Sequence, residues 1–425
     1  DIVNLDYRGQ NLRPSDTTII YAGRNFSYEA PKGDSSDEYV QIGGPGLSVI
    51  QAADSIDLGT SPGIQIIGNG LNQNLPEGDN HLMVIAGLSS APDLSGLDLF
   101  FNGLRQASAD WAQAWENGDE TLADEIVAQA RETLIEELLG GTDPAISGNI
   151  NMVNSKIFTS GAGGNIYTLA RGEINVGLSA IAQPPILVDI VSEDKESGIY
   201  TVNGGAIKIY AREDINVNES RIMTFSGGDI DILSDYGDIN AGRGSKAAVA
   251  SSDVRYVLQS DNTYKVEYEP PAVGSGIRAT ASDYDDAGDI YPTAWEGIID
   301  AGEAGIAGKN VIVAAQTVLN AQNISATGFS TGFTAPSEGG ADISGFTGSG
   351  GLADATAAMG TDQGTMARAQ ERQNAVLPEG YSIEPRWVDV EVIDFEEEDE
   401  DEDKGSRETE NDAASLETVR TGTTI

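Results

Sequence analysis

A glycine-led phrase recurs along the middle of the chain and restricts the fold more than any other feature. It reads GGNIYTLARGEINVG at 163–177, GGAIKIYAREDINVN at 204–218 and GGDIDILSDYGDINAG at 227–242. Weaker copies lie at 44–60, 287–302 and 305–326. The three clear copies begin 41 and 23 residues apart, and the longer gap contains an insertion. A unit of about 20 residues is typical of a solenoid built from strand coils and is too short for a helical-pair repeat.

Apolar and polar side chains alternate within each copy, as in the run Ile207, Lys208, Ile209, Tyr210, Ala211 and Arg212. A period of two is the pattern of a strand with one buried and one solvated side. Glycine at the corners permits positive φ and a close approach between stacked turns. We therefore predict an all-β chain that forms a parallel β-helix, with Ile, Val, Leu and Ala stacked inward. An antiparallel sandwich of similar strands is the alternative, which the recurrence of one phrase disfavours.

The composition agrees with a thin, repetitive β core and excludes several classes of protein. The 425 residues include 51 Gly, and only 6% are aromatic. A net charge of −44 disfavours binding to nucleic acid and to anionic membranes and attracts cations.

The chain has no Cys, which excludes disulfides, thiolate nucleophiles and zinc fingers. No stretch reaches the ~18 apolar residues of a membrane span. Because the chain begins at Asp1 rather than Met, we expect a piece of a longer precursor.

The pattern changes to a helical period at 93–144. Apolar residues recur three to four positions apart at Leu122, Ile126, Ala130, Leu134 and Leu138. Asp119 stands in the N-cap neighbourhood, and Gly140 with Gly141 provides a stop signal. An earlier helix is expected over 105–116, with Trp111 and Trp115 at i, i+4 spacing. We predict an inserted helical hairpin that covers a flank of the solenoid, with docking of a partner as the alternative role.

The rest of the chain divides by composition. We expect β-helix coils at 1–92 and 145–330, the latter with two loop insertions, a Gly/Ala/Ser-rich linker at 331–380, a strand at 381–395 and an acidic, disordered tail at 396–425. The late strand carries the side chains predicted to mediate assembly, namely Trp387, Val388, Val390, Val392, Ile393 and Phe395. An unpaired β edge accepts another strand. We predict that this strand adds to a β-structure in its own or a neighbouring subunit.

Candidate chemistry is sparse. His81 is the chain's one histidine, and a Ser-His-Asp triad would have to use it; we interpret it as a structural residue at a corner. The densest acidic cluster outside the tail consists of Asp283, Asp285, Asp286 and Asp289. Three interpretations stay open for it: a solvated loop, a Ca²⁺ site built from hard oxygen ligands, or a general acid and base for glycoside cleavage.

Several phrases occur in the order found in a known family. They are DIVNLDYRGQNLRPSDTTIIYAGRNFSYEAP, IGGPGLSVIQAADSIDLGTSPGI, GGDIDILSDYGDINAGRGSKAAV, GSGIRATAS and IDAGEAGIAGKNVIVAAQTVLNAQNISATG. Over most of residues 1–328 the chain resembles the C-terminal region of filamentous-haemagglutinin-family exoproteins. The resemblance implies a right-handed parallel β-helix that is exported across the outer membrane, typically by a two-partner route. It also implies an extracellular or cell-surface location and a role in adhesion or surface structure, and it provides no catalytic residue to carry over.

We therefore predict a non-enzymatic structural or adhesive protein without a cofactor, with no nucleic-acid partner. Its expected partners are further copies of the chain, joined by strand addition or end-to-end coil stacking, and glycans or proteins on host or other cell surfaces. One alternative is a carbohydrate-active enzyme that uses the acidic cluster beside Tyr284, Tyr291 and Trp295. A second is a surface-layer or matrix protein that depends on Ca²⁺ for folding or assembly.

Overall fold

A computed structural model describes residues 1–29, 38–69, 74–89, 92–139, 148–161, 163–177, 197–243, 275–281 and 286–333, and the backbone of 253–258 and 264–269. All of them lie in the first of the two units into which the chain divides, Asp1–Ala353.

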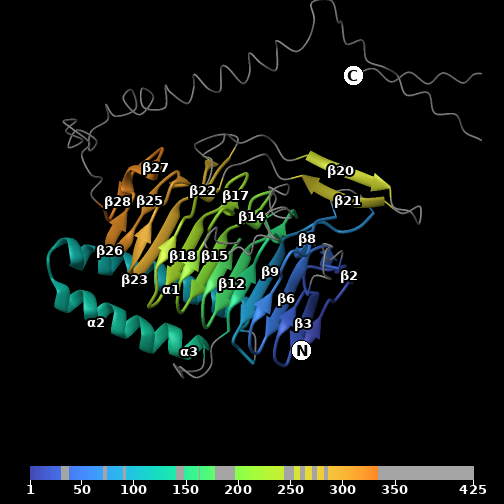
Figure 1. Cartoon of the computed structure of the whole chain (residues 1–425), viewed down its shortest axis with the longest axis horizontal. Coiled ribbons are helices and arrows are strands. Elements are labelled where there is room, and N and C mark those ends of the chain that lie inside the picture. Colours follow the sequence, from blue (N-terminus) through green and yellow to red (C-terminus); the bar gives the residue numbers. More distant parts are fainter. Residues whose placement is uncertain are drawn as a thin grey trace, which may run out of the picture. The chain divides into compact units, whose positions relative to one another are not determined.

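Three strands make one coil, and successive coils stack with their strands parallel (Figure 1). The stacked strands form three faces. Face I contains β3 (Thr17–Ala22), β6 (Gly46–Ala52), β9 (Asn80–Ala86), β12 (Ile166–Ala170), β15 (Ile207–Ala211), β18 (Ile230–Ser234), the start of β23 (Ile290–Asp300), β25 (Val311–Ile312), the start of β26 (Ala314–Leu319) and β28 (Ser330–Thr331).

The other two faces follow the same order. Face II contains β1 (Ile2–Val3), β4 (Phe26–Ser27), β7 (Ile56–Asp57), β10 (Ile150–Met152), β13 (Ile174–Val176), β16 (Ile215–Asn216), β19 (Ile239–Asn240) and the ends of β23 and β26. Face III contains β2 (Tyr7–Gln10), β5 (Val40–Gly43), β8 (Ile64–Ile67), β11 (Lys156–Thr159), β14 (Gly198–Thr201), β17 (Arg221–Thr224), β22 (Gly276–Ala279), β24 (Ile306–Gly308) and β27 (Ile324–Ala326), which is followed on the chain by β28.

Equivalent residues of successive coils lie in columns. Ile207 is paired with Ile166 on one side and with Ile230 on the other. The face II column runs through Ile56, Ile150, Ile174, Ile215, Ile239 and Ile299. All of these side chains belong to one buried core cluster inside the coil. The prediction of a parallel β-helix is confirmed, and the antiparallel sandwich is excluded because every strand pair in the described coils is parallel.

The second glycine of each opening pair explains the repeated phrase. Gly205 and Gly228 both have a φ of +101°, which side chains with a Cβ atom rarely adopt. A Cβ on Gly228 would overlap the carbonyl oxygen of Gly205, and one on Gly205 would overlap that of Gly164. The corners therefore stack backbone directly on backbone, and glycine is the residue that fits there.

The helical insertion follows β9 and consists of α1 (Leu94–Glu116), α2 (Glu120–Ala130), a π-helical turn η1 (Arg131–Ile135) and α3 (Glu136–Leu139). The first helix includes the expected residues 105–116 and begins earlier, at Leu94, where the side chain of Asp93 accepts a hydrogen bond from the backbone N–H of Gly96 at 2.7 Å. The predicted cap at Asp119 is confirmed by its hydrogen bond from Leu122. A separate antiparallel pair joins β20 (Asp253–Leu258) to β21 (Tyr264–Glu269), and a 3₁₀ turn η3 spans Ala321–Asn323.

The predicted apolar stripe of the second helix is confirmed in part, since Ala130 is buried and Ile126, Leu134 and Leu138 are partly buried. Leu122 is 44% exposed, whereas the buried side chains are Ala123, Val127, Ala130, Ile135 and Leu139. The step from Ala130 to Ile135 spans five residues, which the π turn accommodates because it contains an additional residue. A strict 3.6-residue period cannot anticipate such a turn.

The outward side of face I is covered by α1 rather than solvated as predicted. Lys208 and Tyr210 are buried, and Tyr210 belongs to an outer apolar cluster shared by the sheet and the helices. The sheet contributes Val49, Met83, Ile85, Tyr167, Leu169, Leu233 and Trp295 to this cluster, and α1 contributes Leu97, Phe100, Phe101, Leu104 and Trp111. The prediction that the hairpin covers a flank of the solenoid is confirmed. Within the described residues, no helix combines the length and apolar character needed to cross a bilayer.

We predict that Gly242→Ala lowers the free energy of unfolding by about 2 kcal/mol or more, measured by urea denaturation. Gly242 has a φ of +86°, and a Cβ there would overlap the carbonyl oxygen of Asn218 in the preceding coil. The matched control is Gly23→Ala, since a Cβ there meets no atom within 4 Å. Equal effects of the two substitutions would contradict corner-on-corner stacking.

Candidate functional site

The interface between the helical hairpin and face I holds most of the buried charge in the described part of the chain. Arg105 of α1 reaches across to β18, where its Nε and Nη2 donate to the two carboxylate oxygens of Asp231 at 2.9 and 2.7 Å. Its Nη1 donates to Asp229 at 3.1 Å. The guanidinium lies over the ring of Tyr291, 3.9 Å from the ring centroid. Arg105 thus holds α1 to two successive coils.

Arg131 makes an equivalent contact from the π turn. Its Nε donates to Oδ1 of Asp235 at 2.7 Å, and its Nη2 donates to the backbone carbonyl of the same residue at 3.0 Å. Its Nη1 donates to Glu296 of β23 at 2.6 Å, and the guanidinium stacks on Tyr236. The π turn therefore places a cation over the corner where face I turns toward face II.

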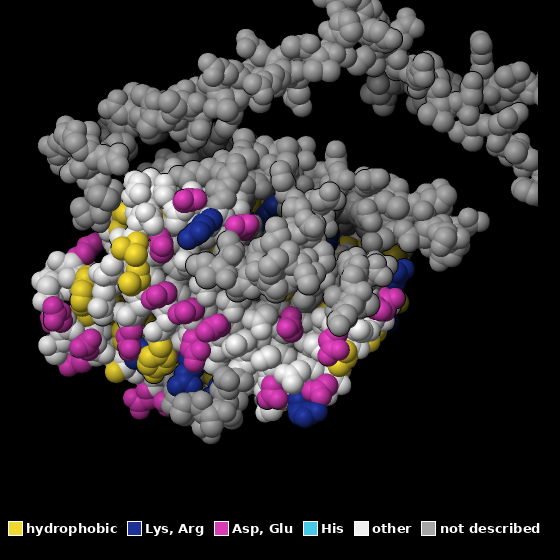
Figure 2. Space-filling model, viewed as in Figure 1, with side chains coloured by type: hydrophobic (Ala, Val, Ile, Leu, Met, Phe, Trp, Pro, Cys, Tyr) yellow, Lys and Arg dark blue, Asp and Glu magenta, His cyan; other side chains and the backbone are white. Residues whose placement is uncertain are grey.

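A third contact lies near the start of α1. The carboxylate of Asp98 accepts hydrogen bonds from Nζ of Lys208 at 2.9 Å and from the hydroxyl of Tyr167 at 2.8 Å. Together the three contacts connect the hairpin to the coils of β12, β15, β18 and β23. Acidic side chains are spread over the surface around α2, and basic ones are few (Figure 2).

Burial makes these pairs interdependent. It raises the pKa of Asp231 although Arg105 opposes the shift, and it raises the pKa of Asp235 against the opposing effect of Arg131. A buried carboxylate that loses its cation is destabilised as an anion, because water solvates it poorly, or it takes up a proton. The contacts therefore specify where the hairpin lies, because any other position would leave buried carboxylates without a counter-charge.

We predict that Arg131→Ala lowers the free energy of unfolding by about 3 kcal/mol, because it leaves the buried carboxylate of Asp235 uncompensated. Arg24→Ala is the control. It removes an exposed ion pair with Asp1 and should cost less than about 1 kcal/mol. Chemical denaturation at pH 7 measures both values, and equal losses would show that Arg131 does not hold the hairpin in place.

His81 has the structural corner role predicted for it. Its Nδ1 accepts a hydrogen bond from the backbone N–H of Asn165 at 3.3 Å. Burial lowers its pKa and so favours the neutral imidazole, and the hydrogen bond from Asn165 assigns Nδ1 as the nitrogen without a proton. Along the same corner, Asn165 accepts from the backbone N–H of Ala206 in the next coil at 2.8 Å. His81 is one member of this row of corner acceptors.

The acidic cluster is only partly described, since Asp283 and Asp285 lie outside the described residues. Asp289 belongs to the row of corner acceptors: its Oδ1 accepts from the backbone N–H and the side-chain amide of Asn310 at 3.2 and 2.7 Å. Its Oδ2 accepts from the hydroxyl of Tyr291 at 3.2 Å. Among the described residues no group of three or more acidic or His side chains is arranged to hold a metal ion, so the Ca²⁺ site stays a prediction.

Of the aromatic residues named for the enzyme alternative, Tyr291 contacts the acidic cluster through its hydrogen bond to Asp289. Trp295 is 1% exposed beneath the hairpin, and Tyr291 is covered by Arg105. The third aromatic residue, Tyr284, and the predicted assembly strand around Trp387 lie outside the described residues.

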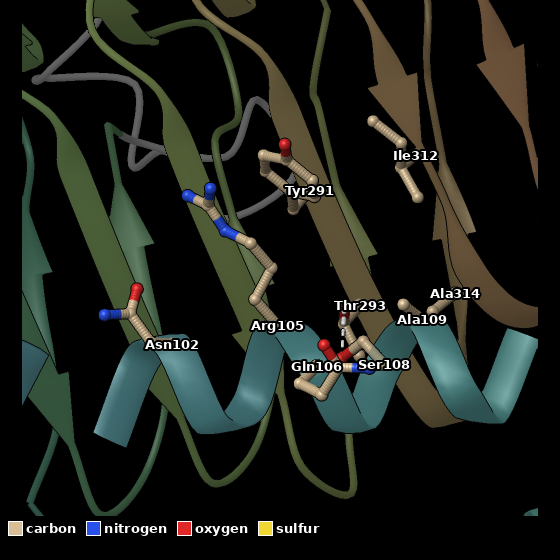
Figure 3. Close-up of a pocket in the computed structure, with 9 residues that line it drawn as sticks. All are labelled: Asn102, Arg105, Gln106, Ser108, Ala109, Tyr291, Thr293, Ile312 and Ala314. Atoms are coloured by element: carbon tan, nitrogen blue, oxygen red, sulfur yellow. Dashed lines mark hydrogen bonds between the residues drawn. The ribbon is translucent and has the colours of Figure 1, made fainter. Parts of the chain in front are cut away.

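Two pockets flank the line where α1 lies on β23 and β26. The first has a volume of about 240 Å³ and is lined by Asn102, Arg105, Gln106, Ser108, Ala109, Tyr291, Thr293, Ile312 and Ala314 (Figure 3). In it the hydroxyl of Thr293 donates to that of Ser108 at 3.0 Å. The second has a volume of about 210 Å³ and is lined by Trp111, Asp124, Val127, Ala128, Arg131, Trp295, Glu296 and Gln316.

The sequence contained a signal for this interface that the search for motifs missed. Arg105 and Arg131 are the only basic residues between 94 and 139, among ten acidic ones. Both face the sheet. A lone cation on a helix that is otherwise acidic and apolar predicts a specific acidic partner, although it cannot identify that partner.

Comparison with known proteins supports the family resemblance. Residues 227–335 match a family model described as "Filamentous haemagglutinin family outer membrane protein". The matched segment runs from β18 to beyond β28 and includes the sheet-side partners of both arginines, such as Asp231 and Glu296. No curated protein and no solved structure matches the chain.

Proposed function

We propose that this chain is a non-catalytic, extracellular structural or adhesive protein displayed at the cell surface. The observation that carries the proposal is the stack of parallel coils whose last part matches a filamentous-haemagglutinin-family outer membrane protein. A rigid stack of this kind presents side chains along its flank without needing a deep cleft. The polar side chains of its corners and seam form hydrogen bonds that join coil to coil or helix to coil.

Self-assembly is the second part of the proposal. Within the described residues, β1, β2 and β3 pair only with strands of the following coil, so the first coil presents a strand edge. Such an edge is a template for another strand. The segment with Trp387, Val388, Val390, Val392, Ile393 and Phe395 has the strand pattern to fill an edge of this kind in a neighbouring chain. End-to-end stacking of coils is the other route to a polymer.

We predict that deleting residues 381–425 abolishes polymers seen by negative-stain electron microscopy, while the circular dichroism spectrum keeps its β signature. Deleting only 396–425 is the matched control, since it removes the acidic tail and keeps the strand. Polymers that persist without residues 381–395 would contradict strand addition and favour end-to-end stacking.

The two alternatives differ from this proposal in their products and in their dependence on ions. A carbohydrate-active enzyme would release new reducing ends or unsaturated products from neutral or acidic polysaccharides. A Ca²⁺-dependent matrix protein would change its melting temperature and assembly state between chelator and millimolar Ca²⁺. The proposed adhesive protein does neither and binds instead to a surface coated with its receptor.

A further inference from the structure

The two ends of the coil stack carry most of the exposed apolar side chains in the described part of the chain. Nine large hydrophobic side chains are exposed there. Four of them lie in the first coil and two in the last, namely Val3, Leu12, Ile19 and Tyr21, and Leu319 and Phe329. Apolar side chains that are exposed singly need no explanation, but a set gathered on one surface indicates a contact.

The last coil ends where the first coil begins in the order of the faces. The last described strands lie on face II, face III and face I in turn, as the end of β26, β27 and β28. The first strands, β1, β2 and β3, follow the same order. Within the described residues, each of these six strands pairs on one side only. A second copy placed on the last coil therefore continues every face with a parallel strand.

The outward column of face II is polar except at its two ends. Its interior members are Ser27, Asp57, Asn151, Asn175, Asn216, Asn240 and Asp300. At one end lies Val3, which pairs with Ser27 and is 48% exposed, and at the other lies Leu319, which pairs with Asp300 and is 45% exposed. Stacking of two copies places these two apolar side chains next to each other, so that each covers the other.

The core columns end in the same complementary way. On face II the inward column ends in Ile2 and Val318, and on face III it ends in Tyr7 and Ile324. All four side chains are only partly buried, whereas the interior members of both columns are buried. Across a junction between two copies, each pair lies one strand spacing apart. The contact therefore closes both open ends of the core.

The remaining exposed side chains fit the same junction. Leu12 and Phe329 both lie in a connection from face III to face I, one in the first coil and one in the last. Ile19 pairs with Val49 of the outer apolar cluster, so Ile19 and Tyr21 lie on the outward side of face I. The hairpin covers that side in later coils, and the connection from α1 to α2 extends beyond β26 (Figure 1). This connection is placed to cover Ile19 and Tyr21 of a following copy.

Charge at the two ends does not oppose the contact. Residues 317–333 of the last coil contain no charged side chain, and residues 1–24 contain three Asp and three Arg, although the whole chain carries a net charge of −44. Exposed strand edges are usually protected by charged side chains or proline, and residues 317–333 have neither. Repulsion between like charges of two copies is therefore weak where the free edges lie.

A second copy fits these features better than a single added strand does. A single strand pairs with one of the three edges of the first coil and leaves the apolar side chains of the other two faces exposed. A coil provides a strand for each edge and an apolar side chain for each exposed one.

We propose that copies of the chain stack end to end, with the last coil of one copy paired to the first coil of the next. The proposal rests on the proposed self-assembly and specifies the surfaces that its end-to-end route uses. The end of β26 pairs with β1, β27 with β2 and β28 with β3. This register sets Val3 of one copy beside Leu319 of the other.

Disulfide trapping between two single-cysteine chains tests this register. The chain has no Cys, and paired positions on adjacent strands lie ~4.8 Å apart, within the range of Cα separations in disulfides. We expect an equimolar mixture of Val3→Cys and Leu319→Cys chains to form a mixed disulfide on mild oxidation, identified by mass spectrometry of the linked peptides. The matched control mixes Asn216→Cys with Leu319→Cys chains. It should give little mixed product, because Asn216 lies in the middle of the same column.

A charge placed at the junction provides a second test that needs no disulfide. Val3→Asp and Leu319→Asp each bring a carboxylate into an apolar contact and should raise the concentration at which polymers sediment by about tenfold or more. Leu99→Asp is the matched control, since Leu99 is 73% exposed on α1 and lies away from both ends. Circular dichroism checks that all three variants keep the β signature of the unaltered chain.

The proposal is overturned if Val3→Cys and Leu319→Cys chains form no more mixed disulfide than the Asn216→Cys control. It is also overturned if Val3→Asp and Leu319→Asp chains polymerise at the same concentration as the unaltered chain. If either result is found while polymers still require residues 381–395, the end-to-end contact is wrong and the proposed self-assembly stands through strand addition. If the unaltered chain forms no polymer at any concentration, the contact and the proposed self-assembly both fail.

Discussion

Backbone hydrogen bonds between successive coils determine the spacing on which the rest of the molecule depends. Each coil lies at the ~4.8 Å separation of paired strands above the previous one. This spacing brings identical positions into columns, so that Ile207 lies against Ile166 and Ile230. It also leaves no room for a Cβ at the stacked corners, which is why the second position of each opening pair is glycine, as at Gly205 and Gly228. The glycine-led phrase and the apolar interior both follow from this separation between coils.

The inserted helix follows the same spacing. An α-helix rises 1.5 Å per residue, so about three residues of α1 pass one coil. Asp98 reaches β12 and β15, Arg105 reaches β18, and Ser108 reaches β23. A helix laid along the stack can therefore bind successive coils in order with residues from one of its sides. The polar groups that meet it, such as Lys208 and Asp231, lie on strands whose outward side would face water in a bare solenoid.

The fold could be predicted from the sequence because its determinants are local and repeated. The alternation seen in IKIYA and the paired glycines each occur several times. Because successive repeats stack in chain order, equivalent positions can be paired from the repeats alone. The covered flank could not be predicted in the same way. Whether Tyr210 faces water or a helix depends on a segment about 100 residues earlier in the chain, and no period in either segment records the pairing. The π turn at 131–135 could not be predicted either. Its Arg131 contacts Asp235 and Glu296, which lie about 100 residues or more further along the chain.

The pocket between α2 and the sheet depends on this long-range pairing, since α2 provides Asp124 while β23 and β26 provide Trp295 and Gln316. Trp295 is buried beneath the hairpin, while Tyr291 contacts Asp289 of the acidic cluster. A filamentous-haemagglutinin-type coil stack alone would present a regular flank. The hairpin brings Trp111, Arg131 and Asp124 to Trp295 and Glu296 of the sheet.

The helix α1 lies along face I and contacts its coils in order, and the contact of Ser108 with Thr293 is one of these. The chain has no Cys, so a pair introduced as Ser108→Cys and Thr293→Cys reports this one contact without background. The two hydroxyl oxygens are 3.0 Å apart in the structure. Mild oxidation should yield an intramolecular disulfide, seen as a mass loss of two hydrogen atoms and faster migration on a non-reducing gel. A folded protein that keeps both thiols free would show that the helix does not lie on these coils.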